Sequence, residues 1–151
     1  MILKKCWRSL LAVSLMLSCL CGTAAAASDN VVPMEDLTCE AVVGPVSVWD
    51  NQPDMRVTTR VNMNVAANRL SVSSTKFSLE IGETVTFNCS YTPSSASVDF
   101  GVIAPNGHFY YLNATNGSIN KTIGVSQRGT YSLAVRNNSA STVSVAGFVS
   151  Y

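Results

Sequence analysis

The sequence predicts an all-β protein that folds as an antiparallel β-sandwich of seven to nine strands. Three observations support this prediction. Apolar and polar residues alternate with a period of two in several segments, no long segment has helical spacing, and turn residues recur about every 8–12 residues. The residues that come before the first regular segment lack this alternation.

The amino-terminal segment has the three parts of a secretory signal peptide. Lys4, Lys5 and Arg8 form a basic region, Leu10 to Cys21 is largely apolar, and Ala25 and Ala27 form a small-residue cleavage site. We therefore predict that residues 1–27 are a signal peptide, that the remaining chain is secreted, and that it has no membrane span after cleavage.

Two alternatives to this interpretation remain. A lipoprotein would carry its lipid anchor on Cys19, but Leu17, two residues earlier, is unusual in a lipobox. The uncharged run at 9–28 approaches the length of a membrane span, but its second half is alanine, which is weakly hydrophobic.

Composition limits the classes of function. The chain has 151 residues, enough for one domain, with 47% apolar and 13% charged residues and a formal net charge of +1. Cleavage after Ala27 would leave seven basic and nine acidic residues, a net charge of −2. A nucleic-acid-binding protein needs a concentrated basic face, so this class is excluded.

The exported chain divides into two parts. Residues 28–55 alternate only briefly and are predicted to be an irregular arm with at most one strand, whereas residues 56–151 are predicted to form the sandwich. The clearest strand is Arg56–Val65, in which Val57, Thr59, Val61, Met63 and Val65 point one way and the polar residues between them point the other way. Pro105-Asn106-Gly107 predicts a hairpin, either with an Asn-Gly turn or with a three-residue loop and a left-handed Gly107. The further predicted strands lie around residues 70–72, 77–81, 85–91, 98–102, 109–111, 119–125, 130–135 and 142–151.

Two segments resemble immunoglobulin domains. The run from Gly82 to Cys89 resembles the B strand, and Gly129-Thr130-Tyr131 resembles the tyrosine corner before the F strand. The resemblance implies that the hydroxyl of Tyr131 bonds back to the main chain. Leu133 replaces the second cysteine and Phe100 the tryptophan, so the sandwich would be immunoglobulin-like or jelly-roll-like, without the inter-sheet disulfide.

The same part of the chain resembles bacterial pre-peptidase carboxy-terminal domains, through Val98–Phe100, Ala104–Gly107 and Gly129–Val135. Residues 56–151 are also similar to short secreted proteins of Gram-positive anaerobic bacteria. The shared motifs, in order, are Cys89-Ser-Tyr-Thr-Pro, Ser97-Val-Asp-Phe-Gly, Ala104-Pro-Asn-Gly and Val135-Arg-Asn-Asn-Ser. This resemblance implies the fold and export, and it implies no activity.

The precursor has five cysteines, and three of them leave with the predicted signal peptide. Cys39 and Cys89 remain. They could form a disulfide in an oxidising compartment, which would stabilise the fold by about 4 kcal/mol on the chain-entropy model. Alternatively, Cys89 is a buried apolar residue in phase with Val85 and Phe87, and Cys39 is an unpaired thiol.

The sequence contains little material for catalysis. His108 is the only histidine and lies beside the predicted hairpin turn, so no catalytic triad can be assembled. The segment from Asp50 to Asp54 is rich in oxygen ligands, but it lacks the spacing of a calcium loop and is typical of a proline-containing turn. We predict that the protein is not an enzyme and uses no cofactor or metal.

Binding is the more plausible class of function. Trp49, Tyr110 and His108 could present ring faces to a sugar. The favoured alternative is that Tyr110 is a single exposed residue, with Phe109 and Tyr111 in the core. We therefore predict an extracellular binding or accessory module for a protein or a glycan, and alternatively an accessory partner of a secreted hydrolase or peptidase. A polar surface of Asn, Ser and Thr is also predicted by five Asn-x-Ser/Thr sequons, at Asn88, Asn113, Asn116, Asn120 and Asn137.

Overall fold

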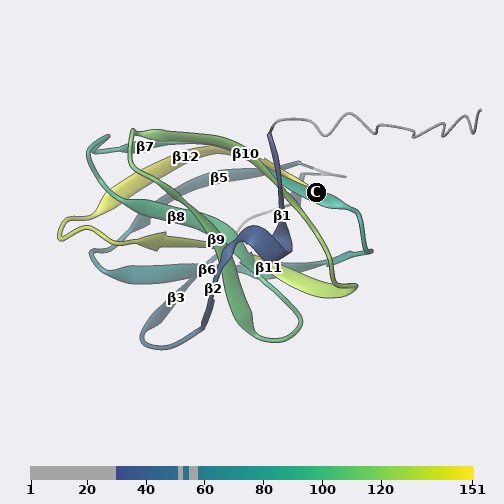
Figure 1. Ribbon diagram of the computed structural model, residues 1–151. Helices are drawn as coiled ribbons and strands as arrows, with labels where there is room; N and C mark the ends of the chain where they lie inside the picture. The colour runs from purple at the N-terminus through teal and green to yellow at the C-terminus, as the bar shows by residue number, and fades with distance from the viewer. Residues whose placement is uncertain (1–29, 51–52, 55–57) are drawn as a thin grey trace, which may run out of the picture.

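Two six-stranded β-sheets lie one over the other and enclose the main core (Figure 1). The computed structural model describes residues 30–50, 53–54 and 58–151, and the predicted signal peptide lies outside them. Sheet A, in spatial order, consists of β1 (Val31–Pro33), β10 (Ser118–Gly124), β7 (Thr84–Thr92), β12 (Val143–Ser150), β5 (Thr58–Val65) and β4 (Pro53–Asp54). Sheet B consists of β2 (Thr38–Ala41), β9 (His108–Ala114), β8 (Val98–Ile103), β11 (Gly129–Asn137), β6 (Arg69–Leu79) and β3 (Val46–Trp49).

The eight strands from β5 to β12 form a jelly roll. Sheet A contains the order β10-β7-β12-β5 and sheet B the order β9-β8-β11-β6, with antiparallel pairing throughout. The predicted all-β sandwich is confirmed, and its jelly-roll form is the one observed. In an immunoglobulin domain the last strand would lie in the sheet of β11 and β8, whereas here β12 lies between β7 and β5.

The remaining strands are short and lie at the sheet edges. Residues 31–49, which were predicted to belong to an irregular arm, form β1 and the 3-10 helix η1 (Met34–Asp36), and then β2 and β3. β1 pairs in parallel with β10, β2 pairs with β9, and β3 pairs in parallel with β6. The arm therefore crosses from one sheet to the other, and the buried side chain of Met34 anchors this crossing.

The main core lies between the sheets and is built by the predicted alternation. On β7, Val85, Phe87 and Cys89 point inward and are buried, while the residues between them face solvent or are partly exposed. Phe100 on β8 packs its ring against Phe87, with 6.2 Å between the ring centroids. Burial of such side chains is the main favourable term in folding, so these strands hold the two sheets together.

The predicted β8–β9 hairpin is present with a three-residue loop. The amide of Ala104 donates to the oxygen of His108 at 3.0 Å, and Gly107 has a φ of 79°. Glycine adopts this left-handed conformation without steric cost. Among the described residues, no helix has the length and hydropathy needed to cross a membrane.

Candidate functional site

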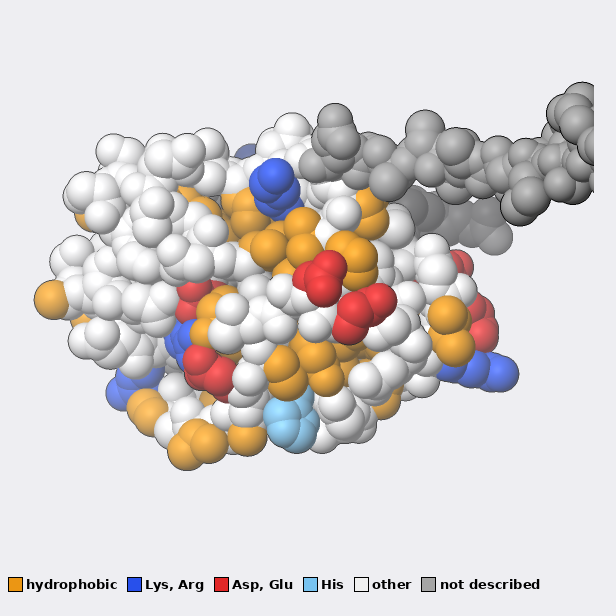
Figure 2. Space-filling view, viewed as in Figure 1, with side chains coloured by type: hydrophobic (Ala, Val, Ile, Leu, Met, Phe, Trp, Pro, Cys, Tyr) orange, Lys and Arg blue, Asp and Glu red, His pale blue; other side chains and the backbone are white. Residues whose placement is uncertain are grey.

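The outward face of sheet A is polar and almost uncharged. Asn, Ser and Thr occupy nearly all outward positions of β10, β7, β12 and β5, and the exceptions are Arg60, Gly124, Ala146 and Phe148. In the space-filling view, the upper left of the molecule, where Figure 1 places β7 and β12, shows few charged side chains and is mostly white, the colour of the backbone and of uncharged polar side chains (Figure 2). Because this face has few charges, hydrogen bonding is the main interaction that it can make with a ligand.

One cross-strand row on this face contains its only exposed aromatic ring. Asn120 on β10 is paired with Asn88 on β7, Asn88 with Phe148 on β12, and Phe148 with Arg60 on β5. We call these four residues the Phe148 row. Adjacent strands lie about 4.8 Å apart, so neighbouring side chains in the row are in reach of one ligand. Phe148 is 52% exposed, which is unusual for a phenylalanine within a sheet.

Several polar side chains in other rows of this face are used within the protein. Hydroxyl oxygens of Thr86 and Thr122 are 2.9 Å apart, those of Thr58 and Ser150 are 3.2 Å apart, and Ser144 bonds to Asn64 at 2.7 Å; these six residues hold one another across the strands. In the Phe148 row, by contrast, the side chains of Asn88, Asn120 and Arg60 have no hydrogen-bond partner among the described residues. Their donors and acceptors are available to a ligand.

The surface is hollowed on both sides of Phe148. One hollow of about 440 Å³ lies over β10, β7 and β12, and another of about 300 Å³ lies over β7, β12 and β5. Ser90, Ala146 and Phe148 line both hollows. The small side chains of Ser90 and Ala146 therefore leave room beside the Phe148 ring, and the two hollows form one shallow surface across the sheet.

The two aromatic residues singled out from the sequence lie elsewhere. Trp49 is on β3 and Tyr110 on β9, with three strands of sheet B between them, so they do not share a site. Both are partly buried and pack against the main core. The Tyr110 hydroxyl accepts a hydrogen bond from the side chain of Asn106 at 2.9 Å. The buried indole nitrogen of Trp49 has no hydrogen-bond partner in the described part of the chain.

On β9, the side chains that face the main core are not Phe109 and Tyr111, as the sequence alternative placed them. Tyr110 faces the main core, whereas Phe109 and Tyr111 are buried in a second, smaller cluster on the other face of sheet B. Leu70 and Ala134 belong to this cluster, and Val42 packs over it. The arm that carries Val42 covers apolar residues that a bare sandwich would expose.

Cys39 and Cys89 are separate, free thiols in the structure. Cys39 is exposed on β2, at the edge of sheet B, and Cys89 is buried on β7, inside sheet A. No disulfide joins the two cysteines in the structure, so Cys89 is a buried residue and Cys39 an unpaired thiol. Burial raises the pKa of the Cys89 thiol to about 11, so this thiol is neutral at ordinary pH.

Tyr131 makes the hydrogen bond that its resemblance to a tyrosine corner implies. Its hydroxyl donates to the main-chain oxygen of Gln127, four residues upstream, at 2.5 Å. Its ring is fully buried and stacks on Phe77, with 6.4 Å between the centroids. The residue therefore seals one end of the sandwich and has a structural role.

The residues considered for catalysis and metal binding do not come together in one site. The Nδ1 of His108 lies 3.2 Å from the main-chain oxygen of Asn106, within its own hairpin. Asp50 accepts a hydrogen bond from the hydroxyl of Ser74. Among the residues that the structure describes, no three His, Cys, Asp or Glu side chains are grouped so that they could hold a metal ion.

Two polar motifs noted in the sequence, Ser97–Gly101 and Val135–Ser139, come together at the carboxylate of Asp99 on sheet B. Asp99 is 1% exposed and accepts hydrogen bonds from Arg136 Nε at 2.8 Å, from Asn113 at 2.6 Å and from Asn138 at 2.7 Å. A buried carboxylate is tolerated when it is paired and fully hydrogen-bonded. The Ser97–Gly101 and Val135–Ser139 motifs thus contribute to stability and leave no free group on Asp99 for a ligand.

Arg136 connects this cluster to the arm. Its guanidinium also donates to Glu40 Oε2 at 2.7 Å and lies 4.5 Å from the centroid of the Tyr111 ring, whose hydroxyl donates to Glu40 Oε1 at 2.6 Å. Hydrogen bonds from Arg136 and Tyr111 lower the pKa of Glu40. Burial, together with the hydrogen bond to Glu40, raises the pKa of Tyr111.

Sequence reasoning missed the Phe148 row, although a signal was present. In the last strand Val143, Val145 and Val149 occupy the inward phase, and Phe148 lies in the polar phase. A large aromatic residue at an outward position departs from the alternation of the strand. Such an exposed apolar residue indicates a contact surface.

No protein-family model and no curated protein matches the chain. A mutant of PliG-Ec, a periplasmic inhibitor of g-type lysozyme from Escherichia coli, aligns with a TM-score of 0.41 and 11% identity, over 71% of this chain and 98% of that one. PliG of Aeromonas hydrophila, also a periplasmic inhibitor of g-type lysozyme, aligns with a TM-score of 0.49 and 16% identity, over 70% of this chain and 96% of that one.

Proposed function

We propose that the protein is a secreted, non-catalytic binding module that holds a neutral glycan on the outward face of sheet A. The observation that carries this proposal is the Phe148 row, in which an exposed ring lies beside amide and guanidinium groups that have no partner in the described chain. The predicted signal peptide supports export.

The chemistry of the row matches that of a sugar. Each hydroxyl of a sugar both donates and accepts hydrogen bonds, and the side-chain amides of Asn88 and Asn120 can do both as well. The C–H face of a pyranose ring is apolar and can cover the exposed Phe148 ring. Arg60 adds donors at the end of the row.

The surroundings of the row favour a neutral ligand. Arg60 is the only charged residue at the outward positions of the four central strands, so neither an acidic nor a basic polymer gains much from this face. The two hollows beside Phe148 are shallow and continuous, which suits a linear chain that lies across the strands.

The experiment is a screen of neutral polysaccharides, followed by calorimetric titration of those that bind. Phe148→Ala is expected to weaken binding by at least about tenfold, as for the loss of an aromatic anchor. Ile81→Ala is the matched control, because Ile81 is an apolar residue that is 70% exposed in the turn after β6. Binding should change little with salt because the ligand carries no charge.

Two results would contradict the proposal. One is the failure of all neutral glycans to bind the folded protein. The other is an equal loss of binding in Phe148→Ala and Ile81→Ala, which would place the ligand away from the row.

A further inference from the structure

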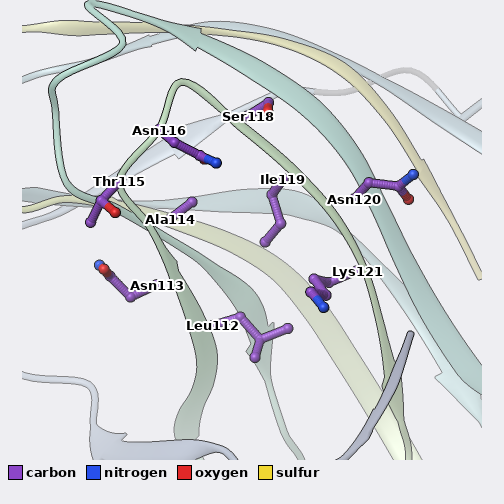
Figure 3. A pocket seen from close by; sticks show the side chains of 9 residues that line it. All are labelled: Leu112, Asn113, Ala114, Thr115, Asn116, Ser118, Ile119, Asn120 and Lys121. Carbon is purple, nitrogen blue, oxygen red and sulfur yellow. The ribbon is translucent and has the colours of Figure 1, made fainter. Parts of the chain in front are cut away.

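A cleft lies on the other side of β10, between β9 and β10. The cleft has a volume of about 400 Å³ and opens where the two strands leave their turn (Figure 3). Leu112, Ala114 and Ile119 form its apolar floor, and Ile119 and Lys121 lie on the cleft side of β10, while Asn120 points to the opposite side (Figure 3). The cleft meets the hollow beside Phe148 along β10, because Ser118, Ile119 and Asn120 line both.

The edge of sheet A is only partly covered at this cleft. β1 pairs with Thr122–Gly124 of β10, so Ser118 to Lys121 have no neighbouring strand on that side among the described residues. β2 similarly covers His108 to Tyr111 of β9 and ends before Leu112. Both strands that border the cleft therefore have an uncovered end at the same place.

The uncovered part of β10 presents main-chain donors and acceptors to the cleft. The amide of Thr122 donates across this edge to the oxygen of Asn30 at 3.1 Å, so Thr122 faces away from β7. Alternate residues of a strand direct their main-chain groups to the same side. The N–H and C=O groups of Ser118 and Asn120 therefore point to the open edge, where the described chain supplies no partner.

These features match an extended polypeptide. Its main-chain groups repeat at the spacing of Ser118 and Asn120, and every second side chain would point down onto the apolar floor. β1 shows that this edge accepts a short parallel strand. Lys121 has no ion pair in the described part of the chain, and its ammonium group favours a carboxylate on the incoming strand.

We propose that the open edge of β10 binds an extended segment of a partner protein by strand addition. The segment would lie in line with β1, with an apolar side chain over Ile119 and an acidic side chain near Lys121. The proposed strand would bind the main-chain edge of β10, whereas the proposed glycan would lie on the outward side chains of sheet A, so the two are tested with different probes.

The probe is the synthetic hexapeptide Thr-Val-Thr-Asp-Thr-Val, in which valine and aspartate are two residues apart and so lie on one face, and its binding to the full exported chain is measured by calorimetry. A second peptide with N-methyl groups on alternate residues cannot donate to the edge. Ser118→Pro removes one edge-facing N–H but keeps the hydrogen bonds to β7, and Ser118→Ala is its matched control because it keeps the N–H. Far-ultraviolet circular dichroism and urea unfolding show that the variants are folded.

We expect the plain peptide to bind the wild type and Ser118→Ala equally, and Ser118→Pro at least about fivefold more weakly. The N-methylated peptide should not bind. Lys121→Glu should weaken binding at low salt, and replacing Asp with Lys in the peptide should restore it. Hydrogen exchange at Ser118 and Asn120 should be fast in the free protein and slow in the complex.

Several outcomes would overturn the proposal. Equal binding by Ser118→Pro and Ser118→Ala, or by the two peptides, would exclude strand addition. Slow exchange at Ser118 and Asn120 before peptide is added would mean that the edge is already occupied by the chain itself. A dimer in sedimentation equilibrium that Ser118→Pro dissociates would make a second copy the occupant.

Discussion

The guanidinium of Arg136 on β11 donates to the carboxylate of Glu40 on β2 at 2.7 Å, across 96 positions of the sequence. The same guanidinium bonds to Asp99, which is buried on β8. One side chain therefore joins the edge strand contributed by the arm to two central strands of sheet B. This contact makes residues 38–41 part of the folded domain.

Arg136→Ala is expected to destabilise the protein by about 3 kcal/mol, because it leaves the buried carboxylate of Asp99 without its cation. Urea unfolding of the variant and the wild type measures the difference. Arg128→Ala is the control: Arg128 pairs with Glu80 at 3.2 Å, but both side chains are largely exposed, and the expected loss is below about 1 kcal/mol. Equal losses in the two variants would mean that burial of Asp99 does not set the cost.

The contact with Glu40 should also make stability depend on pH. The pKa of Glu40 is lowered from 4.5, first by the hydrogen bond from Arg136, so the folded state favours the ionised carboxylate. This contribution is complete above pH 4.5 and is lost as the pH falls through the lowered value. About half of the Glu40 side chain is exposed, which limits the effect to less than about 1 kcal/mol.

The measurement for this second prediction is urea unfolding at about pH 6 and about pH 3. Glu40→Gln should be less stable than the wild type at the higher pH and should lose less stability on acidification. A wild type and a variant with the same change between the two pH values would show that Glu40 does not contribute.

The alternation of side chains made the strands predictable, but it did not determine how they pair. The period of two on β7 and β5 follows directly from one buried and one exposed face. Whether β12 joins β11 or β7 depends on the path of the connection, and either choice buries the same face. For this reason an immunoglobulin-like and a jelly-roll-like order remained open until the pairing was seen.

The edge strands and the sheet B cluster were beyond prediction for a different reason. β2 has four residues, all of them exposed, so the brief alternation of Cys39 and Ala41 with polar residues does not mark a buried face. Asp99 and Arg136 occupy outward positions that pattern analysis assigns to solvent, and only their long-range pairing explains their burial. The Phe148 row, in contrast, could have been found from a phenylalanine in the polar phase of β12.

The two cysteines should react at very different rates with a thiol reagent. Cys39 is exposed, whereas Cys89 is buried with its pKa raised to about 11 by desolvation. At neutral pH the native protein should therefore take up one equivalent rapidly and the second only after unfolding, as measured by mass spectrometry. Cys39→Ser should abolish the rapid phase. An exported protein with no reactive thiol before reduction would contradict the arrangement of free thiols.

Asn137→Asp should be among the most damaging single-atom changes in the chain. Asn137 is fully buried, and its amide nitrogen donates to the main-chain oxygens of Val65 at 3.0 Å, Ala66 at 3.2 Å and Ser141 at 2.7 Å. Aspartate would direct a second oxygen at these three acceptors, so we expect a loss of about 3 kcal/mol or more in urea unfolding.

The matched control for this change is Asn116→Asp. Asn116 is exposed in the turn between β9 and β10, and its side chain has no hydrogen bond to another described residue, so its replacement should alter stability by less than about 0.5 kcal/mol. If the two variants unfolded at the same urea concentration, the amide of Asn137 would not be what connects the end of β5 in sheet A to β11 in sheet B. The difference between them therefore measures how much this one side chain contributes to holding the two sheets together.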